Sequence, residues 1–319
     1  MVGHASSGKT MLGECMLACS GKINRLGSVN EGTTMSDYHK AEQERKFSIH
    51  TSLLHAEWLE SRFNIIDTPG YLDFLAESRA ALKVSDLAVV VAHATHGIEI
   101  GTSKVWDFAE EFGLAKVVVV NGIDVENAKY EPILKDLKTT FGARFFPINI
   151  PINPGPGYNE MFDVIRKAKL TYKTDNSGKY DEEKVDGEEG EQVDQLHTQL
   201  IELVAESDDT LLEKFFDEGI TEEELRGGLH KAFQSKTFIP VFFTSSETNV
   251  GIARLMDFIS KYASSPDDHM ETVAQNVDGE EVTISLDDKE AAAFVFKTIN
   301  ESHIGELSFV KVLSSTLKS

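Results

Sequence analysis

The chain has 319 residues, 41% of them hydrophobic, a length and composition that suit one large globular domain or two. Its formal net charge of −22 excludes a broad basic surface, so sequence-specific DNA binding is not expected and any RNA contact must be local. No apolar run approaches the roughly 18 residues needed to span a membrane. The first twenty residues are the candidate targeting segment, and Gly8 and Lys9 interrupt it. We therefore expect a cytoplasmic protein without a membrane segment.

Five short apolar runs predict strands that are buried on both faces: 63–66, 87–92, 116–120, 145–150 and 238–243. Stretches with helical spacing lie between them, at 102–112 and 130–141. Strands that alternate with helices predict an α/β fold whose sheet is mostly parallel and flanked by helices.

The alternation breaks after about residue 170. Segment 181–194 holds eight acidic residues in fourteen, which predicts a solvated, mobile loop. Helical spacing returns at 196–216, and Thr221 with Glu224 forms a capping box that opens another helix. We therefore expect a helical insertion at about 171–235, before the last strand of the sheet.

Beyond Pro266 the pattern changes again. We interpret 267–290 as a linker, and the runs 294–298 and 307–312 flank a turn containing Gly305, which predicts a hairpin. The first 266 residues would then form one domain with its insertion.

The octet at 3–10, Gly3-His4-Ala5-Ser6-Ser7-Gly8-Lys9-Thr10, fits the P-loop pattern G-x-x-x-x-G-K-S/T. It is followed by the helix-compatible segment 11–19. In such a loop, backbone N–H groups surround a phosphate, Lys9 bridges phosphates and the Thr10 hydroxyl binds Mg²⁺. A chance glycine-rich turn is the alternative.

A second element, Asp67-Thr68-Pro69-Gly70, directly follows the predicted strand at 63–66. In P-loop proteins a carboxylate here supports Mg²⁺ through water, and the glycine N–H contacts the γ-phosphate. Alone, these four residues would more often be a turn, but the strand and the P-loop before them favour the functional interpretation.

The third element, Asn121-Gly122-Ile123-Asp124, follows the strand at 116–120, where GTPases place N-K-x-D. An aspartate there accepts hydrogen bonds from guanine N1 and N2, a pair of donors that adenine lacks, so it selects GTP over ATP. Gly122 replaces the lysine, which predicts weaker guanine binding with its selectivity kept. Taken alone, this loop could also be a tight turn.

Together these motifs resemble elongation factor G, particularly its divergent elongation-factor-G-like branch, over nearly the whole chain. The resemblance also rests on GSVNEGTTMSDY at 27–38, QERKFSI at 43–49, DTPGYLDF at 67–74, GIEIGTSKVW at 97–106 and NGIDVENA at 121–128. It implies that 200–216 belongs to the insertion of that family and that 291–319 begins a β-barrel domain. Because little precedes the P-loop and the chain stops in a hairpin, we expect a fragment of a longer protein.

The resemblance implies roles on the phosphate side of a GTP and Mg²⁺ site. Lys9 and Thr10 would hold phosphate and magnesium, Asp67 would support magnesium, and Gly70 would contact the γ-phosphate. Ser48 stands where the family has a switch threonine that binds magnesium in the GTP state. Metal ligands would therefore be Thr10, Ser48 and Asp67.

On the base side, Asn121, Asp124 and Ser246 would read guanine, with Ser245 in the same loop. Tyr71 stands where the family has a histidine that orients the attacking water, so the residues implied in catalysis are Lys9, Gly70 and Tyr71. Ser6 replaces an aspartate that is common in elongation factors.

The resemblance implies hydrolysis of GTP by a monomer that is stimulated by the ribosome, in translocation or ribosome recycling. Two alternatives stay open: a ribosome-binding module that holds GTP with little hydrolysis, and a P-loop ATPase or kinase in which Asp124 has no base role. Other conspicuous side chains are interpreted as surface or core residues without a ligand role: Cys15, Cys19, His39, His50, His55, His93, His96, Trp58 and Trp106.

Overall fold

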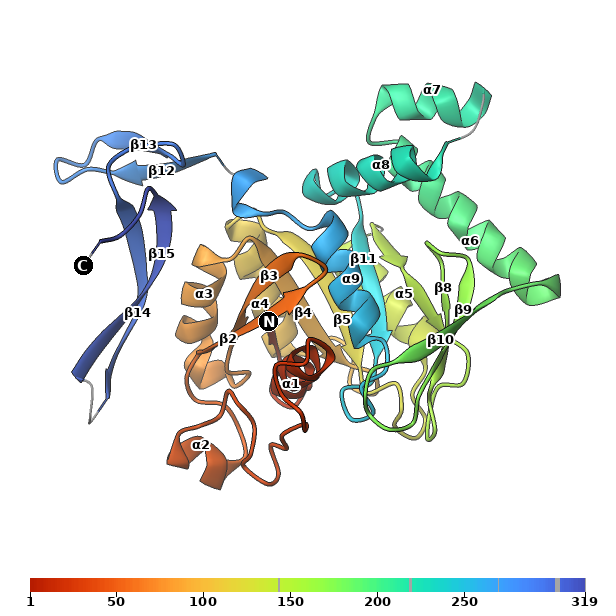
Figure 1. The fold of residues 1–319 in the computed structure, drawn as a ribbon, viewed down its shortest axis with the longest axis horizontal. Coiled ribbons are helices and arrows are strands. Elements are labelled where there is room, and N and C mark those ends of the chain that lie inside the picture. The colour runs from red at the N-terminus through yellow and green to blue at the C-terminus, as the bar shows by residue number, and fades with distance from the viewer. Residues whose placement is uncertain (143, 218–219, 269, 302–304, 319) are drawn as a thin grey trace.

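The computed structural model describes residues 1–142, 144–217, 220–268, 270–301 and 305–318. Its centre is a five-stranded sheet with the order β1-β4-β5-β11-β6, in which all paired neighbours are parallel. These strands are β1 (Val2–Gly3), β4 (Leu87–His93), β5 (Ala115–Asn121), β11 (Ile239–Thr244) and β6 (Phe145–Pro147). Helices cover both faces of the sheet (Figure 1). The predicted α/β class with a parallel sheet is confirmed.

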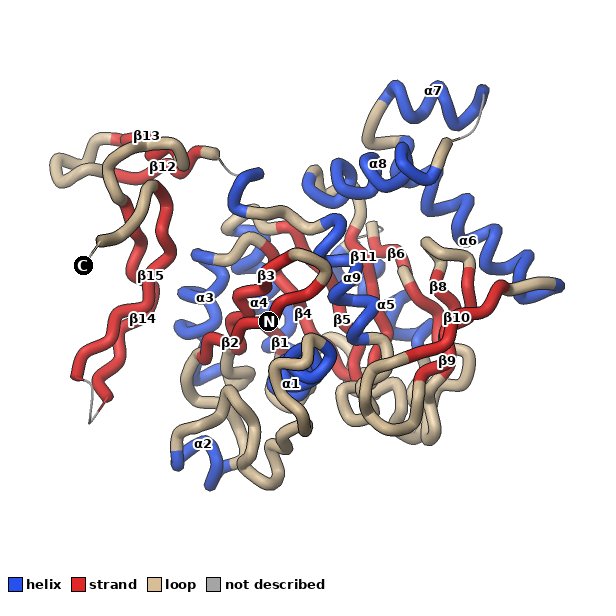
Figure 2. The backbone as a smooth tube through the Cα atoms, viewed as in Figure 1, coloured by secondary structure: helices blue, strands red, loops and turns tan. Residues whose placement is uncertain are grey.

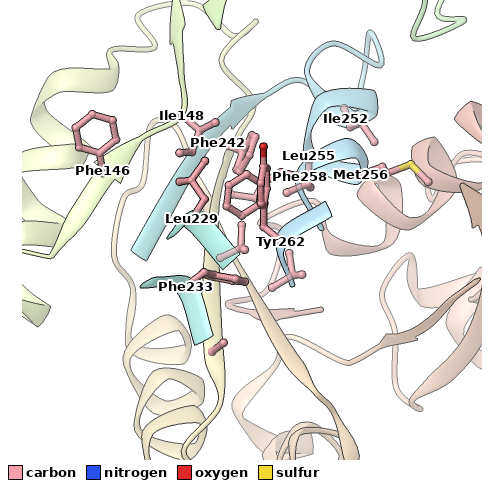
Figure 3. Close-up of a cluster of buried hydrophobic side chains, with 14 of the residues drawn as sticks. Phe146, Ile148, Leu229, Phe233, Phe242, Ile252, Leu255, Met256, Phe258 and Tyr262 are labelled. Atoms are coloured by element: carbon pink, nitrogen blue, oxygen red, sulfur yellow. The ribbon is translucent and has the colours of Figure 1, made fainter. Parts of the chain in front are cut away.

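Successive residues of the central strand β5 point into two hydrophobic layers. Val117 and Val119 belong to one buried cluster, and Val118 and Val120 belong to the other. The first layer is covered by α1 (Lys9–Cys19), α8 (Glu222–Gln234) and α9 (Ile252–Tyr262), and the second by α4 (Ile100–Glu111) and α5 (Tyr130–Phe141). Figure 3 shows the part of the first layer that lies around Phe242. Since each buried aliphatic side chain is worth about 1.5 to 3 kcal/mol, these layers hold the end of β5 in place.

Two of the five predicted strands differ from expectation. The run 63–66 lies in β3 (Ser61–Asp67), which pairs antiparallel with β2 (Ser52–Trp58) outside the central sheet and has alternating burial. The run 145–150 is divided: β6 ends at Pro147, and β7 (Asn149–Pro151) joins a different sheet. Ile148 N–H still donates to the Val241 carbonyl at 2.9 Å, but the next N–H of β11 that faces this strand, that of Phe243, donates to the side chain of Asn149 at 2.8 Å, so the backbone pairing ends there.

The segment between β6 and β11, which includes the insertion predicted at 171–235, combines a sheet with helices. Strands β7, β8 (Glu160–Asp163), β9 (Ala168–Tyr172) and β10 (Tyr180–Lys184) form an antiparallel sheet, which is followed by α6 (Gly187–Ala205), α7 (Asp209–Asp217) and α8. The prediction of a mobile loop at 181–194 is therefore wrong, whereas the helical spacing at 196–216 corresponds to the end of α6 and to α7. Acidic side chains of α6 face solvent, while Val193 and Leu200 are buried and secure the helix. The capping box of Thr221 and Glu224 is confirmed.

Further antiparallel strands lie in the C-terminal part of the chain. Within the segment interpreted as a linker, β12 (Glu271–Gln275) pairs with β13 (Glu281–Ser285). The predicted hairpin is present as β14 (Ala292–Glu301) paired with β15 (Gly305–Ser314), although its tip at 302–304 lies outside the described residues. Figure 2 shows these strands on the opposite side of the molecule from α6 and α7. The short elements are α2 (Lys40–Arg45), η1 (Leu72–Phe74) and η2 (Pro266–Asp268).

The C-terminal hairpin is joined to the central domain by two lysines. Lys297 Nζ donates to the Thr51 carbonyl at 2.8 Å and to Glu77 Oε2 at 2.9 Å, on α3 (Leu75–Val84). Lys311 Nζ donates to Asp86 Oδ1 at 2.7 Å. Across the described ranges, no helix combines the length and apolar character required to cross a membrane.

A buried charge network joins the insertion to the central domain. Arg254 of α9 donates through Nε to Asp163 Oδ2 at 2.5 Å, and through its guanidinium to Asp257 Oδ2 at 2.7 Å. All three side chains are less than a tenth exposed. The charges are satisfied only while the complete set is present.

Replacing Asp163 by alanine should lower the free energy of unfolding by about 3 to 5 kcal/mol, because the buried Arg254 Nε would lose its acceptor and only Asp257 would remain to compensate the guanidinium. Urea denaturation measures the loss. Glu111→Ala is the matched control, since it removes the half-exposed partner of Arg79 and should cost no more than about 1 kcal/mol. Equal losses in the two variants would contradict the proposed importance of the buried network.

Candidate functional site

Residues 3–10 form a tight loop between β1 and α1, at the carboxyl edge of the parallel sheet. A Cβ atom on Gly3 would lie 2.2 Å from the Val91 carbonyl oxygen, and one on Gly8 would lie 2.1 Å from Asn121 Nδ2. Gly8 also has a φ of +90°, so both positions require glycine. Because α1 begins at Lys9, the unpaired N–H groups of its first turn surround the loop. This arrangement binds anions, phosphate above all.

Lys9 supplies a buried positive charge to the loop. Its Nζ donates to the His4 carbonyl at 2.7 Å, and burial lowers the pKa of the ammonium group to about 8. The loop after β3 passes close by: a Cβ on Gly70 would lie 2.4 Å from Lys9 Nζ and 2.7 Å from the Ala5 nitrogen. Two of the predicted catalytic residues, Lys9 and Gly70, are thus brought together.

The three predicted metal ligands also meet. Thr10 Oγ1 donates to Asp67 Oδ2 at 2.8 Å and lies 3.1 Å from Ser48 Oγ. The other Asp67 oxygen, Oδ1, is buried without a hydrogen-bond partner, and burial raises the pKa of this carboxyl. Hydroxyl and carboxylate oxygens are the ligands that Mg²⁺ prefers, so these residues fit a magnesium ion.

Sequence analysis missed a second carboxylate beside this cluster, that of Asp37. It is 3% exposed, and neither of its oxygens has a hydrogen-bond partner. Burial raises the pKa of Asp37 to about 6, and the charge of Asp67 adds to the rise. Asp37 follows no predicted strand, so only its place in the stretch GTTMSDY could have drawn attention to it. A divalent cation would compensate both carboxylates.

Glu42, also missed, positions the segment that carries Ser48. Its Oε1 accepts from the N–H groups of Ile49 and His50, each at 2.9 Å. It lies on α2 and is almost fully buried. Since these bonds fix the backbone next to Ser48, they orient its hydroxyl toward Thr10.

The base-side residues gather at the ends of β5 and β11. Asn121 Nδ2 donates to the Ser7 carbonyl at 3.2 Å, while its Oδ1 accepts from Ser246 N at 2.9 Å and Ser246 Oγ at 2.8 Å. Ser245 Oγ accepts from Thr248 N at 3.1 Å and closes the turn of this loop. Asp124 Oδ1 is buried without a partner, which suits a carboxylate that receives a ligand's donors.

The remaining predicted residues shape the loops. Thr68 Oγ1 donates to the Met1 carbonyl at 2.8 Å, the Pro69 carbonyl accepts from Ser78 Oγ at 3.2 Å, and Ile123 is fully buried. Tyr71 is 41% exposed, and its ring centroid lies 4.6 Å from that of Phe47.

Three features define a P-loop GTP-binding domain. They are a P-loop at the carboxyl edge of a parallel sheet, a strand-end aspartate beside two hydroxyls, and an Asn-x-x-Asp loop. Comparison with known families identifies the family to which this GTP-binding domain belongs. Residues 1–265 match the family described as the elongation factor Tu GTP binding domain, and the chain belongs to this family of GTPases.

A solved structure supports the same fold. A protein from Thermus thermophilus, known from its crystal structure, matches with a TM-score of 0.87 and 31% sequence identity. The match covers 99% of this chain and 45% of the Thermus chain. The chain therefore spans less than half the length of this relative.

Replacing Asp37 by alanine should raise the Mg²⁺ concentration needed for tight GDP binding by roughly 10- to 100-fold, the usual effect of losing a residue that supports metal ligands. A magnesium titration of GDP affinity measures this. Asp107→Ala, which removes an exposed acid on α4, is the control for net charge and should leave the midpoint in place. Identical midpoints for the two variants would exclude Asp37 from the magnesium site.

Proposed function

We propose that this chain is the nucleotide-binding part of a translational GTPase of the elongation factor G kind. It would bind GTP with Mg²⁺ and hydrolyse GTP to GDP on the ribosome, during translocation or ribosome recycling, as a cytoplasmic monomer. The observation that carries the proposal is the separation of two sets of polar groups along one sheet edge. Lys9, Thr10 and Asp67 form the phosphate end, and Asp124 with Ser246 forms the base end.

In the proposed reaction, a water oxygen bonds to the γ-phosphorus while the bond to the β–γ bridging oxygen breaks, which releases GDP and phosphate. Charge spreads over the γ-phosphoryl oxygens in the transition state. Lys9 would neutralise part of this charge, and N–H groups of the P-loop and of Gly70 would donate to it. Magnesium, held by Thr10, Ser48 and Asp67, would offset further phosphate charge. The protein thus contributes positioning and electrostatics rather than covalent chemistry.

Guanine selectivity would come from Asp124. Its buried, unpartnered oxygen would be satisfied by a base with adjacent N–H donors and would stay unpaired against adenine. A ligand that leaves this buried carboxylate unpaired binds more weakly, so ATP should bind more weakly than GTP. A competition experiment with GDP and ADP separates this proposal from a P-loop ATPase or kinase.

The exposed Tyr71 ring, which contacts Phe47, supports a second candidate function. A tyrosine that serves only to pack on Phe47 would leave the attacking water without an orienting group. The protein would then hold GTP on the ribosome and hydrolyse it slowly. Single-turnover hydrolysis with and without ribosomes distinguishes the two: the GTPase proposal expects marked stimulation, and the GTP-holding alternative expects almost none.

Changing Tyr71 to phenylalanine should reduce ribosome-stimulated GTP hydrolysis by roughly 10- to 100-fold, about 1.4 to 2.7 kcal/mol of barrier, with little change in GTP affinity. The phenol is a neutral donor and acceptor near pH 7, so it can orient water without acting as a base. Tyr180→Phe, which removes a phenol on β10 rather than at the phosphate end, is a control. Parent-like hydrolysis by the Tyr71 variant would favour the GTP-holding alternative.

A further inference from the structure

His93 lies directly against Gly122, the residue that stands in place of the base-side lysine. A Cβ atom on Gly122 would be 2.7 Å from His93 Nε2 and 3.2 Å from both Cδ2 and Cε1 of the ring. Gly122 also has a φ of +81°, in the left-handed region that favours glycine. The imidazole therefore occupies the space into which any side chain at position 122 would begin to extend.

Several contacts hold this imidazole in place. His93 is the last residue of β4 and is paired in register with Asn121 of β5. The Thr95 N–H donates to His93 Nδ1 at 3.3 Å, and Thr95 Oγ1 lies 2.9 Å from the same nitrogen. The ring also stacks on His96, with centroids 4.8 Å apart and planes 30° apart. The ring is thus fixed at the sheet edge that carries the base-side residues.

Burial favours the neutral form of the His93 ring. Burial lowers its pKa below the ordinary value, and the neighbouring His96 lowers it further, against the opposing charges of Asp124 and Glu99. Accepting a hydrogen bond from the Thr95 N–H also requires Nδ1 to be unprotonated. A neutral, half-buried imidazole offers a flat aromatic face rather than a charge.

A base that donates to Asp124 would lie beside Gly122, which has no side chain to cover it. Aromatic rings stack on nucleobases with a stability of about 1 to 3 kcal/mol per base, and any base presents a suitable face. His93 is the aromatic side chain in contact with Gly122 among the neighbours found there.

We propose that His93 is a base-stacking residue of the guanine site, which covers the purine face that Gly122 leaves bare. Gly122 and His93 then act together. The glycine leaves space for the ring, and the ring takes the place of the aliphatic stem of the absent lysine. This inference rests on the proposed function, since it requires a guanine nucleotide at Asp124. It differs from the interpretation of His93 as a residue without a ligand role, and it offers a replacement for the base contact that the absent lysine would have made.

The test compares the affinities of the chain for GDP and for inorganic pyrophosphate. His93→Ala should weaken GDP binding by roughly 5- to 100-fold and leave pyrophosphate binding unchanged, because only GDP carries a base. His93→Phe keeps a stacking face and should bind GDP within about threefold of the parent. His55→Ala, on the exposed side of β2, is the control for loss of a histidine.

The second arm of the test uses Gly122→Lys. In the parent, this substitution should not tighten GDP binding, because the imidazole blocks the side chain and the left-handed backbone resists it. Combined with His93→Ala, the lysine stem gains room and should recover part of the lost GDP affinity. Recovery in the double variant is a result that a merely structural role for His93 does not produce.

The outcomes separate this inference from the proposed function. A parent chain that binds pyrophosphate but not GDP would overturn both. A parent that binds GDP together with a His93→Ala variant that binds it equally well would overturn the stacking role alone. An equal loss of GDP and pyrophosphate affinity in His93→Ala would also overturn it, since the ring would then only support the P-loop.

Discussion

One buried side-chain amide, that of Asn121, holds together the segments on which the candidate site depends. It donates to the Ser7 carbonyl of the P-loop and accepts from the backbone and hydroxyl of Ser246 in the loop after β11. Asn121 ends a strand that is buried along its whole length, so the two loops are both held to one fixed residue. The glycine at position 8 follows from this contact, because any Cβ there would collide with the amide. A buried polar group with all its partners satisfied specifies a single arrangement.

At the phosphate end, in contrast to Asn121, buried carboxylate oxygens lack partners. Asp37 and Asp67 keep buried carboxylate oxygens without hydrogen-bond partners, and burial raises the pKa of both groups. Lys9 is buried as well, and its pKa is lowered to about 8. Charges in this condition are stabilised by ligands of opposite charge, so the region is suited to a metal ion and phosphates. The Thr51 carbonyl, three residues after Ser48, accepts a hydrogen bond from Lys297, so the segment that carries Ser48 also contacts the C-terminal hairpin.

The fold and site were predictable where one local signal dominated. The runs at 87–92, 116–120 and 238–243 were predicted correctly as central strands because they are buried on both faces, and Asp67 and Asn121 each lie at a strand end, as expected. The run at 145–150 shows the limit, since it stays apolar while the chain passes from the central sheet to a different sheet within it. Segment 181–194 was misjudged because a few buried residues, Val193 among them, suffice to secure an acidic helix. His93 belongs to no motif, and only the three-dimensional contact with Gly122 gives it a role.

The central claim is that the Asn121 amide unites the phosphate and base ends of one nucleotide site. The most direct measurement is the affinity of the Asn121→Ala variant for GDP and for inorganic pyrophosphate. The account predicts that both affinities fall by more than about tenfold, because the Ser7 carbonyl and the Ser246 donors lose buried partners that are each worth about 1 to 3 kcal/mol. Pyrophosphate affinity equal to that of the parent would contradict the account, since the P-loop would then keep its shape without the amide.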